Sequence, residues 1–153
     1  MGIQGVEQPE ILQIDETLRL RKYDGVHDFA LEWYLDEETV YLVDGKRDPY
    51  TIERLGRMYR YLNNAGELYF IEVLENDTYK AIGDVTFWQE DMPIVIGDRN
   101  YQGKKIGRKV VSALVKRGKE LGYDYLEIGE IYDWNEGSRR CFESVGFVAY
   151  EKS

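Results

Sequence analysis

Apolar residues recur along the chain at two spacings, every second position and every third or fourth position. The first spacing is typical of a strand with one buried face, and the second of a helix with one buried face. Leucines alternate with arginines over 17–23, whereas apolar residues from Ile106 to Leu121 follow helical spacing. In chain order, the pattern predicts a strand at 17–23, helices at 28–35 and 51–62, strands at 68–75, 79–89 and 94–96, a helix at 106–121, a strand at 125–131, a helix at 135–145 and a strand at 147–150.

The order of these segments predicts an α+β fold in a single domain over residues 1–153. A meander of three strands is followed by a helix long enough to return the chain to a strand parallel to 94–96 through a right-handed connection. Residues 1–15 show no period and are expected to form a loose lead-in. Residues 41–49 are expected to form a loop, with Asp44-Gly45 as a turn signal.

Composition narrows the class of protein. Apolar residues make up 43% and charged residues 32% of the 153 residues, which is ordinary for a soluble globular protein. We expect no membrane span and no signal peptide, since no apolar run approaches about 20 residues. A single cysteine, Cys141, agrees with a reducing cytoplasm, and one histidine with one cysteine makes a metal site unexpected.

Charge singles out the start of the helix at 106–121. Eight basic residues and no acidic residue lie between Arg99 and Lys119, in a chain of formal net charge −9. Helix starts carry unpaired N–H groups and a partial positive charge, and nearby glycines allow a ligand to approach the backbone, so this segment favours a phosphate. The alternative is a solvated basic face. One basic segment in an acidic chain argues against nucleic acid as a partner and fits a polyanionic ligand.

Two segments together resemble the GNAT N-acetyltransferase superfamily. Residues 101–107, Tyr-Gln-Gly-Lys-Lys-Ile-Gly, are similar to the family pattern Gln/Arg-x-x-Gly-x-Gly/Ala. Residues 134–147 are similar to a family asparagine followed at a fixed distance by Tyr-Glu-x-x-Gly-Phe. The likeness covers about Thr17 to Tyr150, and the strand before the loop resembles the ribosomal-protein N-acetyltransferase branch. The resemblance implies a mixed, mostly antiparallel central sheet with helices on both faces.

The resemblance also implies acetyl-CoA as co-substrate and assigns residues to it. The diphosphate would lie on backbone N–H groups of the basic loop, and the pantetheine arm would pair with the strand edge at 94–97 as an added strand. A backbone N–H near Ile96 or Gly97 would polarise the thioester carbonyl. The implied cofactor-binding residues are Ile96, Gly97, Gln102, Gly103, Lys104, Lys105, Ile106, Gly107, Arg108 and Asn135.

Two residues depart from the family pattern. Lys105 stands where the middle glycine is usual, so its side chain would either crowd the phosphate or contact it directly. Phe142 stands where the family commonly has the tyrosine that protonates the thiolate. Water, another residue such as Tyr132 or Cys141, or an unaided step would then serve.

Two carboxylates are candidates for the catalytic base. Counting back from Asn135 places Glu130 on the strand at 125–131, on an inward face where burial would raise its pKa. Asp98, at the end of the preceding strand, is the second candidate. Asp84 and Asp91 are alternatives for binding a cationic acceptor. His27 is expected to be a capping or surface residue rather than a base.

The sequence therefore predicts an N-acetyltransferase that moves the acetyl group of acetyl-CoA to a primary amine by direct attack in a ternary complex. The acceptor is a small molecule or a protein or peptide amine, with no nucleic-acid or membrane partner. Either a monomer or a homodimer is compatible with the sequence. The alternative function is a catalytically degenerate CoA-binding module, which the departures at Lys105 and Phe142 favour.

Overall fold

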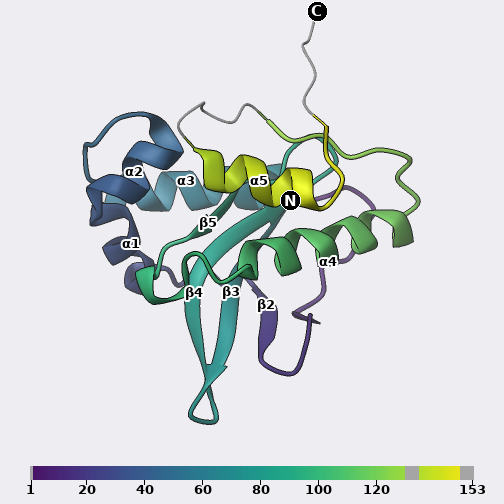
Figure 1. The fold of residues 1–153 in the computed structure, drawn as a ribbon, viewed down its shortest axis with the longest axis horizontal. Coiled ribbons are helices and arrows are strands. Elements are labelled where there is room, and N and C mark those ends of the chain that lie inside the picture. The colour runs from purple at the N-terminus through teal and green to yellow at the C-terminus, as the bar shows by residue number, and fades with distance from the viewer. Residues whose placement is uncertain (1, 130–134, 149–153) are drawn as a thin grey trace, which may run out of the picture.

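A central antiparallel sheet organises the molecule in the computed structural model, which describes residues 2–129 and 135–148. Neighbouring strands pair in sequence order, so β1 and β5 are the two edge strands. Figure 1 shows β2, β3 and β4 side by side. The strands are β1 (Ile11–Gln13), β2 (Leu18–Lys22), β3 (Glu67–Glu75), β4 (Thr78–Phe87) and β5 (Ile94–Ile96).

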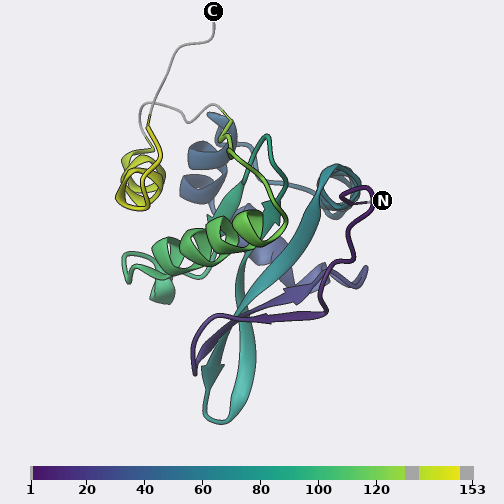
Figure 2. The ribbon, with the colours of Figure 1, turned by 90° about the vertical axis from the view of Figure 1, so that its right-hand side faces the viewer.

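Helices cover both faces of the sheet, as expected, and the fold is the α+β fold predicted from the sequence. One face packs against α4 (Ile106–Glu120) and α5 (Glu136–Ser144), through a core that includes Val110, Val111, Leu114 and Phe142. The opposite face packs against α1 (Leu31–Leu35), α2 (Glu37–Asp44) and α3 (Ile52–Ala65), in a core rich in aromatic rings. Figure 2 shows α4 and α5 together on one side of the sheet and α3 on the other. Short 3-10 helices at Asp28–Ala30 and Arg99–Tyr101 precede α1 and follow β5.

Local sequence signals account for the segments that were predicted well. The Thr51 hydroxyl accepts a hydrogen bond from the Arg54 N–H and so begins α3 at Ile52. Asn76 and Asp77 both have positive φ, which suits the two-residue turn of the β3–β4 hairpin. The Asn135 side chain caps α5 by accepting from the Ser138 N–H.

Two predictions about irregular segments are wrong. Residues 1–15 are not all a loose lead-in, because β1 pairs with β2 in the register Ile11↔Arg21. Residues 41–49 are not all loop, because α2 continues to Asp44. The Asp36 carboxylate caps that helix by accepting from the Thr39 N–H, and Gly45 ends it with a φ of 76°.

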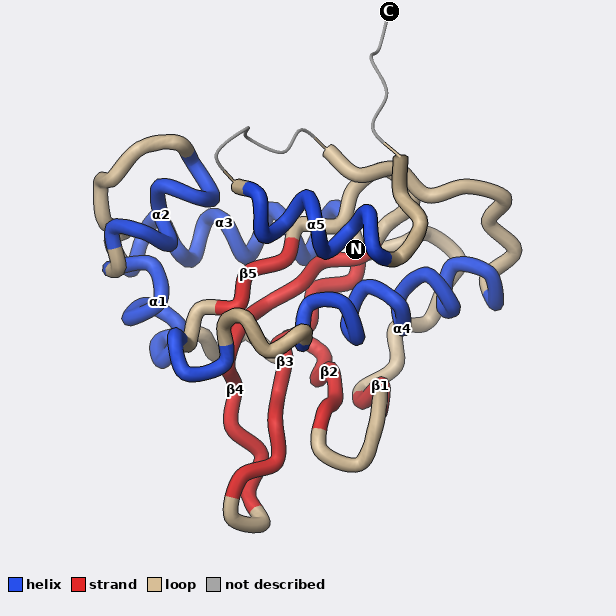
Figure 3. Tube along the Cα trace, in the orientation of Figure 1, coloured by secondary structure: helices blue, strands red, loops and turns tan. Residues whose placement is uncertain are grey.

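The last two predicted strands differ from the structure where it describes them. Residues 125–129 form no regular strand and run as part of the loop after α4, drawn tan in Figure 3. A backbone hydrogen bond still joins this loop to the segment after β4, since the Glu127 N–H donates to the Gln89 carbonyl at 2.8 Å. Residues 147–148 also form no strand, and 130–131 and 149–150 lie outside the described residues. The sheet is therefore antiparallel throughout its described part.

Candidate functional site

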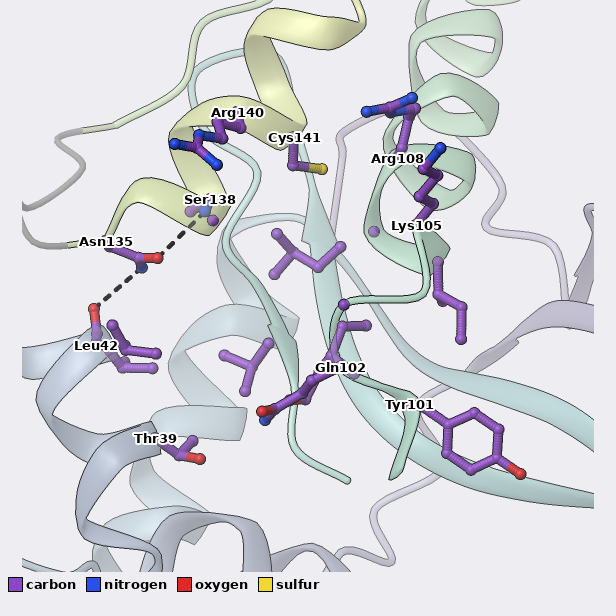
Figure 4. Close-up of a pocket in the computed structure, with 18 residues that line it drawn as sticks. Thr39, Leu42, Tyr101, Gln102, Lys105, Arg108, Asn135, Ser138, Arg140 and Cys141 are labelled. Carbon is purple, nitrogen blue, oxygen red and sulfur yellow. Dashed lines mark hydrogen bonds between the residues drawn. The ribbon is translucent and has the colours of Figure 1, made fainter. Parts of the chain in front are cut away.

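A cavity of about 480 Å³ opens between β5, the start of α4, the start of α5 and one side of α2 (Figure 4). Its volume falls in the range of about 300–1,000 Å³ that is usual for small-molecule sites. Most of the predicted cofactor-binding residues line it: Ile96, Gln102, Gly103, Lys105, Ile106, Gly107, Arg108 and Asn135. Segments far apart in the sequence thus meet where the resemblance implied a binding site.

The edge of β5 supplies unpaired backbone groups to this cavity. Val95 is in register with Asp84 on β4, and the Gly97 N–H donates to the Ile82 carbonyl at 2.8 Å. Hydrogen-bonding groups alternate in direction along an antiparallel strand, so the N–H and C=O of Ile94 and Ile96 face the open edge. The Gln102 side-chain amide already uses one of these groups, donating to the Ile96 carbonyl at 2.8 Å.

Gly97 has a different place from the one predicted. Its N–H is taken by β4 and it does not line the cavity. A Cβ at this position would lie 2.2 Å from Cγ of Trp33, so the glycine lets α1 pack directly on the end of β5. Of the two amides expected near the thioester, the Ile96 N–H is the one that faces the cavity side.

The start of α4 concentrates positive charge at one end of the cavity. Gly103 and Lys105 both have left-handed backbone conformations, with φ of 73° and 64°. Lys105 and Arg108 line the cavity, and Arg140 on α5 lies across from them (Figure 4). Lys104 does not line the cavity, and its ammonium lies 5.7 Å from the centroid of the Tyr101 ring.

The start of α5 forms the neighbouring wall. Asn135 accepts from the Ser138 N–H at 3.2 Å and donates through Nδ2 to the Leu42 carbonyl at 3.3 Å, so its side chain ties α5 to α2 (Figure 4). Cys141 also lines the cavity, and burial raises the pKa of its thiol, with a smaller opposing effect from Arg108. Phe142, by contrast, is only 4% exposed and belongs to the core under α4.

Of the two predicted bases, the structure describes Asp98 but not Glu130. Asp98 does not line the cavity. Its Oδ1 accepts from the Asn100 N–H at 2.9 Å, and its Oδ2 pairs with Lys80 Nζ at 3.0 Å. Its carboxylate therefore has structural partners. Glu130 lies outside the described residues, as does Tyr132. The assignment of the base stays a prediction.

Asp84 and Asp91, the alternatives for binding a cationic acceptor, each already accept two hydrogen bonds through one carboxylate oxygen. Asp84 is 2% exposed, and its Oδ2 accepts from the hydroxyls of Tyr34 at 2.7 Å and Tyr59 at 2.8 Å. Burial raises the pKa of Asp84 to about 6, against the opposing effect of these two hydrogen bonds. Asp91 accepts from the backbone N–H groups of Met92 and Gly129 through its Oδ1.

The wall contributed by α2 was missed from the sequence. Thr39, Leu42 and Val43 line the far end of the cavity, but the chain from Tyr41 onward was expected to be a loop. The capping pair of Asp36 and Thr39, with a glycine at position 45, is the signal that would have predicted a helix there. His27 does not line the cavity, and its Nδ1 lies 2.7 Å from the Tyr23 hydroxyl.

Two kinds of feature are absent from the described part of the chain. None of its helices combines the length and the apolar composition that crossing a membrane requires. No group of three or more metal-ligating side chains occurs in it either.

Comparison with known proteins agrees with the geometry. The family model of the acetyltransferase (GNAT) domain matches residues 17–148. An uncharacterized protein of Methanocaldococcus jannaschii is 34% identical over 89 residues, which are 55% of this chain and 18% of that protein. The chain thus spans less than a fifth of the length of this curated relative.

Solved structures share the fold. A domain from Methanocaldococcus jannaschii superposes with a TM-score of 0.70 at 23% identity, covering 90% of this chain and 93% of that one. An acetyltransferase of the GNAT family from Bacillus anthracis gives 0.67 at 17% identity, covering 89% and 82%. RimL, a ribosomal L7/L12 α-N-protein acetyltransferase solved with coenzyme A, gives 0.63 at 18% identity, covering 90% and 84%.

Proposed function

The chain belongs to the acetyltransferase (GNAT) family, and on that premise we propose that it moves the acetyl group of acetyl-CoA to a primary amine by direct attack in a ternary complex. One observation carries the proposal. The cavity joins the open edge of β5 to the cationic start of α4. The strand edge suits the amides of a pantetheine arm, and the positive charge suits a diphosphate. The acceptor is a small-molecule amine or an amine of a protein or peptide.

The cavity residues fit the two chemical parts of acetyl-CoA. Ile94 and Ile96 offer backbone N–H and C=O groups to the amides of a pantetheine arm, with apolar side chains around them. Lys105, Arg108 and the N–H groups that begin α4 offer positive charge to a diphosphate. The Gln102 side chain already donates to the Ile96 carbonyl, and the second lone pair of that oxygen can accept from a pantetheine amide.

The reaction needs one proton removed from the amine and one delivered to the departing thiolate. Glu130 is the proposed base, and Asp98 is the second choice because it is already paired with Lys80. Phe142 is buried in the core and has no hydroxyl, so this position supplies no proton to the thiolate. An alkyl thiol has a pKa of about 8.5, so a thiolate leaves without obligatory help from an acid.

Two assays test the proposal against the alternative of a CoA-binding module without catalysis, which Lys105 and Phe142 favour. Calorimetric titration with acetyl-CoA is expected to show binding at micromolar to millimolar ligand. Absence of binding at millimolar levels would rule out both functions. Thiol release from acetyl-CoA over a panel of small amines and peptide N-termini separates them, because only the enzyme turns over.

Glu130→Gln provides the test of the base. It is expected to reduce turnover at neutral pH and to leave acetyl-CoA affinity nearly unchanged, since a base acts on the acceptor and not on the donor. Equal loss of turnover and of affinity would make Glu130 a structural residue.

A further inference from the structure

The geometry points to Asp91 as a positioning residue for the transfer reaction: its carboxylate holds the segment 125–129, which leads directly into Glu130, the proposed base. This inference rests on the proposed function, because Asp91 would act through that base. The sequence suggested a cationic acceptor as the partner of Asp91, and the contacts of its Oδ1 give it a different task.

The Asp91 carboxylate is held in place by its own turn. Residues 88–91 form a tight turn between β4 and β5, closed by a backbone bridge between Trp88 and Asp91. Met92 follows, is only 1% exposed in the core under α4, and donates its N–H to Asp91 Oδ1 at 2.8 Å. Because a core residue orients this oxygen, it is a fixed acceptor and not the free end of a surface side chain.

The same oxygen accepts a second hydrogen bond from outside the turn. The Gly129 N–H donates to Asp91 Oδ1 at 2.7 Å, a distance typical of a charge-assisted bond. Gly129 has no room for a side chain here, because a Cβ would lie 2.9 Å from both carboxylate oxygens. The glycine therefore lets the carboxylate approach the main chain closely.

The carboxylate replaces a backbone acceptor in a short pairing of two segments. The Glu127 N–H donates to the Gln89 carbonyl at 2.8 Å. In a parallel ladder the next donor, two residues on, would be the Gly129 N–H, and its acceptor would be the Asp91 carbonyl. That carbonyl instead accepts from the Trp88 N–H at 3.3 Å, inside the turn. The side chain of Asp91 substitutes for it and extends the pairing as far as Gly129.

The tether lies at the end of the segment that is closest in sequence to the proposed base. Leu126 and Ile128 pack against the core, so apolar contacts hold the middle of the segment. Gly129 is exposed and has the Asp91 carboxylate as its partner. Successive Cα atoms are about 3.8 Å apart, so the tether limits where the next residue, Glu130, can begin. Loss of the tether is therefore expected to displace the base more than the core.

Four variants of the full chain test the inference. Asp91→Ala removes the acceptor, and Asp91→Asn keeps an oxygen without the charge. Gly129→Ala leaves the carboxylate in the chain but pushes it off the backbone, because the added Cβ would meet both oxygens. Glu90→Ala is the matched control, since Glu90 is an exposed carboxylate of the same turn.

Amide hydrogen exchange over residues 125–129 measures the tether without any substrate. Loss of one charge-assisted hydrogen bond makes local opening easier, so we expect roughly tenfold faster exchange in Asp91→Ala and in Gly129→Ala. Asp91→Asn should stay within about threefold of the wild type, and Glu90→Ala should match the wild type. Wild-type exchange rates in Asp91→Ala would overturn the inference.

Turnover measures the positioning, with the amine that reacts fastest in the thiol-release assay. Asp91→Ala should lower kcat about tenfold and leave acetyl-CoA affinity, measured by calorimetry, within about twofold of the wild type. Asp91→Asn should recover most of the lost kcat. In a Glu130→Gln background, Asp91→Ala should cause no further loss, because Asp91 acts through that base.

Two results of the turnover assay would contradict the inference. Faster exchange with unchanged kcat in Asp91→Ala would show that the segment does not position the base. A further loss of kcat in the double variant would show that the carboxylate acts on the fold and not through Glu130. Failure of the proposed function is a different result, in which the wild type itself binds no acetyl-CoA or releases no thiol. The exchange measurement then still decides whether Asp91 holds the segment.

Discussion

Substitution of Asp84 by asparagine is expected to stabilise the protein at neutral pH and to leave it nearly unchanged in acid. The carboxyl is fully buried in the aromatic core between β4, α1 and α3, where one of its oxygens accepts from both Tyr34 and Tyr59. An asparagine oxygen can accept the same two hydrogen bonds. The substitution therefore removes the titration of the group while keeping its contacts.

The magnitude follows from the pKa of Asp84, about 6 in the folded protein against an ordinary value of 3.8. The folded state binds the proton more tightly than the unfolded state, so the contribution of this group is fully present below pH 4 and is lost as the pH rises through 6. At about 1.4 kcal/mol per pKa unit, the wild type loses roughly 3 kcal/mol of unfolding free energy over this range through Asp84 alone.

The assay is urea unfolding of the wild type and Asp84→Asn at intervals from about pH 4 to 8, with the difference between the two unfolding free energies plotted against pH. Other carboxyls titrate equally in both proteins and cancel from the difference. Asp124→Asn, at an exposed position, is the control and should give a flat difference. A flat curve for Asp84→Asn, or one in which the variant loses stability toward neutral pH, would refute the reasoning.

Three other substitutions test contacts that position the site. Gly97→Ala should cost about 1–3 kcal/mol of unfolding free energy by overpacking against Trp33, and an unchanged urea midpoint would contradict that close approach. Asn135→Ala should cost about 1 kcal/mol through loss of the α5 cap and should weaken CoA binding measured by calorimetry, because α2 and α5 lose their tie. Glu67→Gln should cost about 3–5 kcal/mol in urea unfolding, since Glu67 is 1% exposed and Arg117 would keep a largely buried charge, whereas a loss below about 1 kcal/mol would show that water solvates Arg117.

The long periodic segments could be predicted from the sequence, for reasons visible in the structure. Helices α3 and α4 each carry a full buried stripe, and the β3–β4 hairpin is fixed by a turn whose residues tolerate positive φ. In each case local chemistry and tertiary packing favour the same conformation. Short segments gave weaker signals, and β1 has only three residues, whose pairing with β2 depends on tertiary contact.

The candidate site could be predicted in part. The basic loop and Asn135 were placed by motif, and the structure brings them together around one cavity. The roles of individual groups depend on partners that no linear pattern shows. Gly97 packs on Trp33, and Asp98 pairs with Lys80 from the neighbouring strand. The α2 wall was missed because a helix of eight residues provides too few turns for a periodic signal.

The most direct test of the account is a crystal structure of the full chain with bound CoA. The account predicts pantetheine beside the open edge of β5, and the diphosphate within hydrogen-bonding distance of backbone N–H groups of residues 103–108. A complex in which those residues do not contact the diphosphate, or in which CoA lies on the sheet face covered by α1 and α3, would contradict it.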